Sequence, residues 1–524
     1  MIFSKIRRAI KEEIAAAGKK KIIIVVVAAI LMFLFVMFES DSFTILSKGR
    51  SGFRTGFFIC SVIAAIMVLA LFFVQRMRKI EIEKIFVVLA LFFGLVFMNL
   101  NPPLQNPDEY YHFQKSIDVS YGNLSPFYLH TDQDIYQLTG PKTVMETKWH
   151  EIYQGTHETD DYKDKYAAMS MSEETVQVKS TGGFHPFISY IPQAIAVLFA
   201  RLFRMNALNT LYLVRAFNAI IYAIMGYFAI KMIPYGKNIL LALALSPICV
   251  SQAASASTDG VCNMLCFLFL ALAMKYSLEE RKGLLGVKDM APFAVILLLL
   301  AFYKYLYIVI GLLVFLIPME KFGGKKKYFK TFAMVVIPLA VLFVIYYTYV
   351  TGNLIHTSTY NEGVDPGKQI AWILANPRMA IGAYENTFER LVIMWMEQFN
   401  ILGSLNFRLG ILTWTVPAWL LFVAVTDVNP KLRLRTRKKI LLLFTGILTV
   451  LLVMLSMFLV WTKVGQLLIE GVQPRYFVPA LPLLFLGFQL KGIRNETKGY
   501  GAKVAAVTVF WLMYAIFCMS SGAY

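Results

Sequence analysis

The chain has 524 residues, of which 58% are hydrophobic and only 16% are charged, whereas a soluble domain usually carries about 25% charged residues. Its formal net charge is +19, but the basic residues stand in short clusters beside long apolar blocks, the pattern of cytoplasmic loops in membrane proteins. This composition excludes an ordinary soluble enzyme and argues against nucleic-acid binding. We predict an all-α polytopic membrane protein.

The apolar blocks predict about 13 membrane-spanning helices, because a helix needs roughly 20 apolar residues to cross a bilayer. The basic N-terminus and the later basic loops place the N-terminus in the cytoplasm. The first block has no cleavage site after it and is interpreted as a retained span. The predicted spans are Ile22–Phe38, Gly56–Val74, Ile85–Leu100, Leu213–Ile230, Ile239–Ser251, Val261–Tyr276, Pro292–Phe302, Leu306–Pro318, Thr331–Val350, Leu409–Val425, Ile440–Val460, Phe477–Leu490 and Val504–Cys518.

One apolar stretch, Pro186–Phe203, is ambiguous. If it crossed the membrane, the lysine-rich loops Lys321–Lys330 and Lys431–Lys439 would face outside, against the positive-inside rule. It also contains two prolines, Pro186 and Pro192, and Arg201 and Arg204 lie near its end. We therefore predict an amphipathic segment along the outer interface. The organisation that follows is an N-terminal segment with two accessory spans (1–84), a membrane module (85–350) with a first outer loop (101–185), a second outer loop (351–407) and C-terminal spans (408–524).

A pair of carboxylates, Asp108 and Glu109, opens the first outer loop directly after an outward span, in a segment with Pro102, Pro103 and Pro107. Prolines restrict the backbone, and a carboxylate held there can deprotonate a hydroxyl or hold a cation. The alternative is a solvated loop acid. If the segment is helical, His112 shares a face with Asp108 and can support it, or it is a surface histidine.

Other charged or titratable residues lie in predicted outward turns. Lys304 stands between two apolar stretches and Arg475 before a late span; both can bind a lipid phosphate, or act as interfacial anchors. Asp259 opens a span, where its charge complements the helix dipole; the alternative is that it binds a substrate or a metal ion. The remaining candidates for a headgroup site are His185 and Arg215. The sequence contains no phosphate loop, no nucleophile elbow and no His-Glu-x-x-His zinc motif, and we assign no metal ligands.

This layout resembles the GT-C superfamily of integral-membrane glycosyltransferases, and most closely a bacterial family of large multi-span proteins long described as uncharacterised. The resemblance runs over about Asn99–Leu490. It rests on Pro107-Asp108-Glu109 with His112, Ser257-Thr258-Asp259, Lys304, Asn376-Pro377, and Gln473 with Arg475-Tyr476-Phe477. Pro474 stands where the family pattern has glycine, which changes the backbone beside Arg475.

The resemblance implies a GT-C-like core with amphipathic helices in the first outer loop, in a bacterial plasma membrane with an extracytoplasmic site. It implies transfer of a sugar from a polyprenyl-phosphate carrier to a glycan or glycolipid acceptor, usually with inversion. Asp108 would be the base, with Glu109 in support, and Arg475, Tyr476 and Lys304 would bind the lipid phosphate. No cofactor is assigned, and a divalent metal stays open. Alternatives are a flippase of lipid-linked sugar, or a polymerase or ligase using a lipid-diphosphate-linked oligosaccharide.

Overall fold

The computed structural model describes residues 62–71, 80–124 without 102 and 105, 137–146, 167–180 without 172 and 173, 182, 185–280, 283–354, 363–398, 401–402, 407–408, 415–427, 432, 434–489 and 499–522. The predicted span Ile22–Phe38 lies outside these residues. The described chain is mostly helical, and its strands form two small antiparallel pairs: β1 (Gln137–Pro141) with β2 (Thr175–Lys179), and β3 (Ile401–Leu402) with β4 (Phe407–Arg408).

Five segments of the described chain are long and apolar enough to cross a membrane: α5 (Ile82–Leu100), α11 (Ala207–Met232), α14 (Asp259–Leu278), the segment Val287–Leu316 and α20 (Thr436–Val460). This supports an all-α membrane protein, while the count of about 13 spans stays a prediction. The other helices are α16 (Lys325–Leu354), α17 (Pro366–Ala375), α18 (Pro377–Gln398), α19 (Thr415–Thr426), α21 (Leu481–Phe488) and α22 (Tyr500–Gly522), with the short helix η6 (Met319–Phe322).

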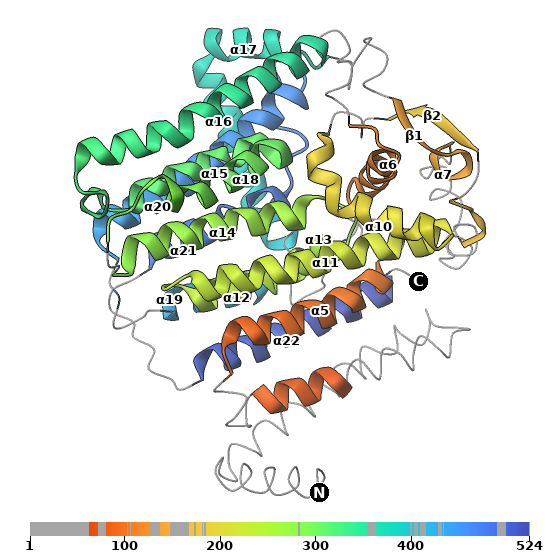
Figure 1. Ribbon diagram of the computed structural model, residues 1–524, viewed down its shortest axis with the longest axis horizontal. Helices are drawn as coiled ribbons and strands as arrows, with labels where there is room; N and C mark the ends of the chain where they lie inside the picture. The colour runs from red at the N-terminus through yellow and green to blue at the C-terminus, as the bar shows by residue number, and fades with distance from the viewer. Residues whose placement is uncertain are drawn as a thin grey trace, which may run out of the picture.

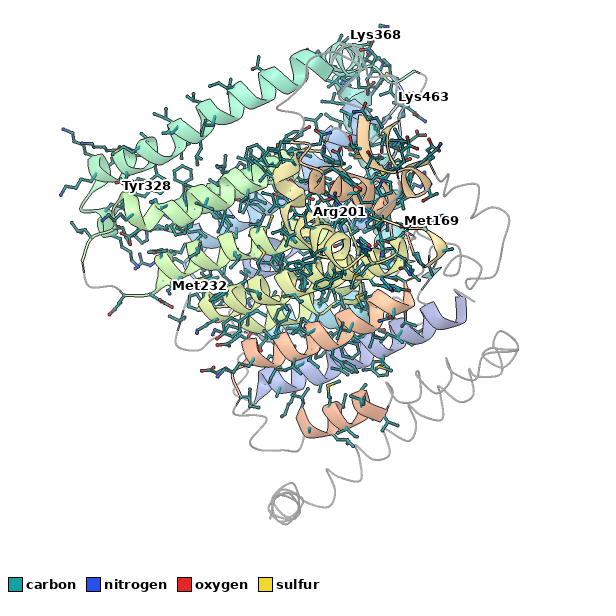
Figure 2. All side chains as sticks on the ribbon, turned by 45° about the vertical axis from the view of Figure 1, so that its right-hand side comes forward. Met169, Arg201, Met232, Tyr328, Lys368 and Lys463 are labelled. Atoms are coloured by element: carbon teal, nitrogen blue, oxygen red, sulfur yellow. The ribbon has the colours of Figure 1, made fainter. Side chains whose placement is uncertain are left out.

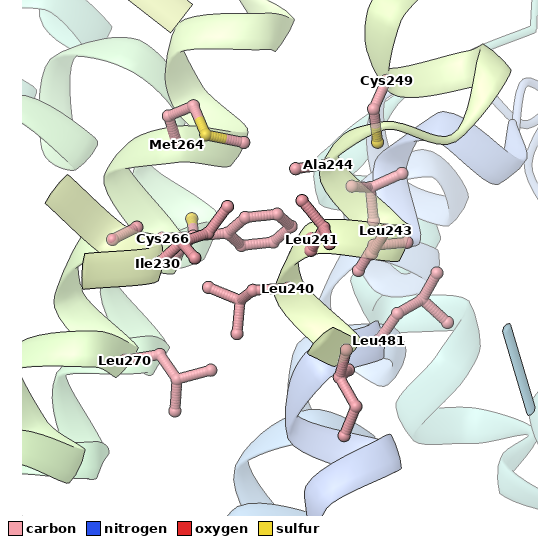
Figure 3. Close-up of a cluster of buried hydrophobic side chains, with 14 of the residues drawn as sticks. Ile230, Leu240, Leu241, Leu243, Ala244, Cys249, Met264, Cys266, Leu270 and Leu481 are labelled. Carbon is pink, nitrogen blue, oxygen red and sulfur yellow. The ribbon is translucent and has the colours of Figure 1, made fainter. Parts of the chain in front are cut away.

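The long helices form a bundle in which neighbours contact one another in the order α16, α15, α14, α11, α5 and α22 (Figure 1). α14 lies in its middle and is buried along nearly its whole length. α5 and α11 approach closely at Gly226, because a Cβ there would lie 2.3 Å from the Phe86 ring. Apolar side chains from α11, α14 and α21 form a shared core; Figure 3 shows Leu270 and Leu481 in it.

The segment Val287–Leu316 is a hairpin. α15 (Val287–Lys304) ends at Lys304, and the 3₁₀ helix η5 (Tyr305–Leu316) runs back beside it. A Cβ on Gly311 would lie 3.2 Å from Leu297, and the amide of Leu285 donates to the carbonyl of Lys321 at 2.8 Å. Lys304 therefore occupies the tip, between the two short apolar segments where the sequence placed it.

The predicted span Ile239–Ser251 is not one continuous helix. The chain forms two short helices there, α12 (Lys237–Ala244) and α13 (Pro247–Ala253). Proline has no amide hydrogen and cannot continue a helix from the preceding turn, so Pro247 instead starts α13. Both helices are buried against the core.

The first outer loop contains α6 (Glu109–Ser120), α7 (Lys142–Glu146), η4 (Phe187–Tyr190) and α10 (Ile191–Leu202). α10 packs beside α11, with the rings of Phe199 and Phe217 6.1 Å apart. η4 runs directly into α10, and the combined helix Phe187–Leu202 falls in the range of 10–17 residues, shorter than the roughly 20 residues that a membrane-spanning helix needs. This length agrees with the prediction that Pro186–Phe203 does not cross; an interfacial position stays a prediction.

The two ends of the bundle differ in chemistry. Met232 and Tyr328 mark one end in Figure 2, and Met169 and Lys463 lie toward the other. At the first end lysines bond the last carbonyls of α14: Lys321 donates to Tyr276 and Glu279, and Lys438 to Ser277. The opposite end brings together the turn after α5, the start of α14 and the tip at Lys304, which position the site.

Candidate functional site

The turn between α5 and α6 holds the two adjacent carboxylates in different directions. Asp108 precedes α6 with a left-handed backbone, φ 62°, a conformation that costs most residues about 1 kcal/mol but suits Asp and Asn better. Its side chain is 55% exposed. Glu109, the first residue of α6, is fully buried. The turn therefore sends one carboxylate outward and the next into the protein.

Glu109 and Arg215, which we term the closed pair, form an ion pair with neither side chain exposed. Arg215 donates from Nε and Nη2 to the two carboxylate oxygens at 2.8 and 2.6 Å. Glu109 also accepts from the amide of Ala256 at 2.9 Å, and Arg215 donates to the carbonyls of Met98 and Asn101. This pair joins α5, α6, α11 and the turn before α14.

Asp108, Asp259, Lys304 and Arg475 meet in a second group, which we term the open cluster. Arg475 Nη2 donates to Asp108 Oδ2 at 2.6 Å, and its Nε lies 3.6 Å from Asp259 Oδ2. Lys304 Nζ lies 2.5 Å from Asp259 Oδ1. Four segments far apart in the sequence thus contribute two acids and two cations to one place.

Tyr476 packs against both cations of the open cluster. Its ring centroid is 4.9 Å from Lys304 Nζ and 5.1 Å from the guanidinium carbon of Arg475, distances at which a cation is attracted to an aromatic face. Tyr307 holds Tyr476 by donating to its carbonyl at 2.7 Å. Pro474 begins the 3₁₀ helix η8 (Pro474–Phe477), so the proline that departs from the family pattern fits the first position of a short helix.

Two histidines lie beside the open cluster. His112 is 6% exposed, and its Nδ1 forms a hydrogen bond of 2.5 Å with the hydroxyl of Tyr190. The rings of His112 and His185 are 5.3 Å apart. His112 is thus not a surface residue, and its ring bonds Tyr190 rather than the Asp108 carboxylate that the sequence suggested. Its backbone amide donates to the Asp108 carbonyl at 3.1 Å. Ser189 ties this region to α15 by donating to Phe302.

The pKa values around the site follow from burial and charge. Desolvation would raise the pKa of Asp108, but the positive charge of Arg475, the nearby His112 and the hydrogen bond from Arg475 together outweigh it and hold that pKa below its ordinary value. Burial lowers the pKa of His112 to about 4, only partly offset by Asp108 and Asp259. Burial likewise lowers the pKa of His185 to about 3. At neutral pH the site therefore combines an ionised Asp108 with neutral imidazoles.

The site residues predicted from the sequence lie close together, although they divide into two groups. Asp108, Asp259, Lys304 and Arg475 share the open cluster, while Glu109 and Arg215 pair away from solvent. The sequence did not indicate the supporting role of Asn106, which donates to Glu109 at 3.4 Å and accepts from Asn101 at 3.2 Å. Its position one residue before Pro107-Asp108 was the available signal.

The arrangement suits acid–base and anion chemistry. An exposed carboxylate can take a proton from a hydroxyl, and an arginine beside a lysine can bind a phosphate. Within the described part of the chain, no group of three or more His, Cys, Asp or Glu side chains could hold a metal ion.

A family model described as "Predicted membrane protein (DUF2142)" matches residues 91–484. No curated protein and no solved structure matches the chain. The family match covers the whole distance from α5 to α21 and so contains both the closed pair and the open cluster.

Proposed function

The chain belongs to this family of membrane proteins, DUF2142, and we propose that it is a glycosyltransferase. It would move a sugar from a polyprenyl-phosphate carrier to a glycan or glycolipid of the bacterial cell envelope, on the outer face of the plasma membrane. The observation that carries the proposal is the open cluster: an exposed carboxylate, Asp108, is held beside two cations, Arg475 and Lys304, that suit a phosphate.

The proposed chemistry uses these residues in one displacement. Asp108 takes the proton of the acceptor hydroxyl as its oxygen forms a bond to the anomeric carbon of the sugar. The bond between that carbon and the phosphate oxygen breaks, and the lipid phosphate leaves with the electron pair. Arg475 and Lys304 stabilise the negative charge that grows on this phosphate. Inversion follows from a single displacement.

Glu109 takes a positioning role in this proposal. It is fully buried and its carboxylate is occupied by Arg215 and Ala256, so it does not reach an acceptor. Because it is the residue next to Asp108, its ion pair fixes the turn from which Asp108 projects. The paired carboxylates thus divide into a base and its support.

The test is sugar transfer by the full chain in nanodiscs, with a panel of polyprenyl-phosphate-linked sugars and cell-envelope glycans, followed by mass spectrometry of the products. Replacing Asp108→Asn should lower the rate by about 10²- to 10⁴-fold, the usual contribution of a general base. Glu81→Gln is the matched control, because Glu81 is an exposed carboxylate before α5, at the far end of that helix.

Near-normal transfer by the Asp108→Asn variant would exclude Asp108 as the base. Translocation of a lipid-linked sugar across vesicles without formation of a glycosidic bond would instead favour the flippase alternative.

A further inference from the structure

The open cluster holds equal numbers of acids and cations. Arg475 contacts Asp108 and Asp259, and Lys304 contacts Asp259. Two carboxylates therefore already occupy the groups that a phosphate would need. A phosphate can reach Arg475 only if one of them gives way, because an uncompensated third anion would be repelled.

The two carboxylates differ in how firmly they are held. Asp259 is 7% exposed, its backbone amide donates to the Ser257 hydroxyl at 3.2 Å, and both of its carboxylate oxygens face a cation. Asp108 is 55% exposed and has no capping bond to the helix that follows it. Its carboxylate has one cationic partner within ion-pair distance in the described structure, Arg475. Asp108 is the carboxylate that can leave.

Arg475 has donors to offer an incoming anion. The side chain is 7% exposed, yet Nε makes no hydrogen bond within the described structure, and its distance to Asp259 is that of an ion pair alone. Once Asp108 leaves, Nη2 keeps only the Tyr476 hydroxyl at 3.3 Å. Nε and Nη2 then form one edge of a planar fork, the geometry that binds two phosphate oxygens.

We propose that an incoming phosphate exchanges with the Asp108 carboxylate on Arg475, so that binding of the anion releases Asp108 toward the acceptor. The identity of the phosphate, as the headgroup of a lipid carrier, rests on the proposed function. The exchange gives the reaction an order, because the donor must bind before Asp108 is free. Separation from the Arg475 guanidinium also makes the Asp108 carboxylate a stronger base when the acceptor hydroxyl must lose its proton.

The exchange makes an unusual prediction, that removing an acidic residue beside the site tightens anion binding. The experiment measures equilibrium binding of farnesyl phosphate and of inorganic phosphate to the full chain in nanodiscs by calorimetry. Asp108→Asn and Asp108→Gly should each bind about three- to tenfold more tightly than the natural chain, since an exposed ion pair no longer competes. Asparagine and glycine both tolerate a φ of 62°, so neither variant strains the turn.

Two matched variants complete the test. Asp108→Glu keeps the charge and should leave the affinity near that of the natural chain, whereas Arg475→Gln should abolish binding. Tighter binding of farnesyl phosphate alone supports exchange with a lipid headgroup, and equal tightening with inorganic phosphate supports exchange with phosphate from either source. Unchanged or weaker affinity in both Asp108→Asn and Asp108→Gly, or no binding by any variant, overturns the exchange.

This measurement involves no sugar transfer, so the two proposals can fail separately. Tighter binding without any detectable glycosidic product would leave the exchange standing and remove the glycosyltransferase proposal. Sugar transfer that depends on Asp108, together with unchanged phosphate affinity in the variants, would support the glycosyltransferase proposal and overturn the exchange.

Discussion

The closed pair and the open cluster begin at consecutive residues, yet they have opposite characters. Glu109 and Asp108 each meet an arginine at 2.6 Å. Glu109 and Arg215 are both fully buried, whereas the Asp108 side chain is 55% exposed. The same pairing of carboxylate and guanidinium is therefore closed to solvent in one case and leaves a carboxylate at the surface in the other.

The difference lies in the backbone and in the supporting hydrogen bonds. The left-handed conformation of Asp108 turns the chain, so the next side chain points into the bundle. Inside the bundle, Glu109 also accepts a hydrogen bond from the amide of Ala256, and Arg215 also donates to the carbonyl of Met98. A buried ion pair is tolerated only when such partners exist. A fully buried ion pair thus lies one residue away from an exposed carboxylate.

The largest expected effect comes from breaking the closed pair. Either Glu109→Gln or Arg215→Gln leaves a buried charge without its partner, which costs about 3–5 kcal/mol of unfolding free energy. The measurement is denaturant unfolding of the purified chain in detergent. The double variant Glu109→Gln with Arg215→Gln removes both charges, and its loss of unfolding free energy should be smaller than the sum of the losses of the two single variants. Additive losses would mean that the two residues do not act as a pair.

The sequence predicted the helical skeleton well where apolar blocks are long. Val261–Tyr276 and Ile440–Val460 lie within α14 and α20, and Lys304 occupies a turn between short segments. The positive-inside argument also placed Asp108 and Arg475 on the same side, and they are in contact. Such arguments succeed because the basic loops and the span ends are local features of the chain.

Two features escaped sequence reasoning for physical reasons. Ile239–Ser251 is uncharged and mostly apolar, and hydropathy alone does not reveal that Pro247 divides it into α12 and α13. The pairing of Glu109 with Arg215 joins residues separated by 106 positions, and many arrangements of helices would satisfy the same charges. Contacts of this kind depend on how α6 packs against α10 and α10 against α11, and they become visible only in three dimensions.

A smaller effect is expected from His112, which is buried like the closed pair but lies beside the open cluster. Its pKa in the folded chain is about 4, below the ordinary value of about 6.5. As the pH falls below 6.5, the unfolded chain binds the proton first, so stability is lost progressively until about pH 4. By pH 5 the loss should reach about 2 kcal/mol.

His112→Gln removes this titration and should make the dependence of thermal unfolding on pH shallower between pH 7 and pH 5. Thermal melts of the natural chain and the variant at both pH values give the comparison. An equal dependence in the two proteins would show that His112 is not buried in its neutral form.

The smallest loss of unfolding free energy is expected from Asp108→Asn, and it distinguishes the open cluster from the closed pair. Asp108→Asn breaks an ion pair whose carboxylate is 55% exposed, and such pairs contribute only about 0.2–1 kcal/mol. Asparagine also accepts the left-handed backbone. The variant should therefore unfold within about 1 kcal/mol of the natural chain under the denaturant conditions that expose the defect in Glu109→Gln. The residual difference should shrink as salt is added, because exposed charges are screened and buried ones are not. The opposite result would be a loss of unfolding free energy in Asp108→Asn that is as large as that in Glu109→Gln and insensitive to salt. It would mean that the ion pair of Asp108 is also structural, so that the open cluster has no carboxylate free to exchange with a phosphate.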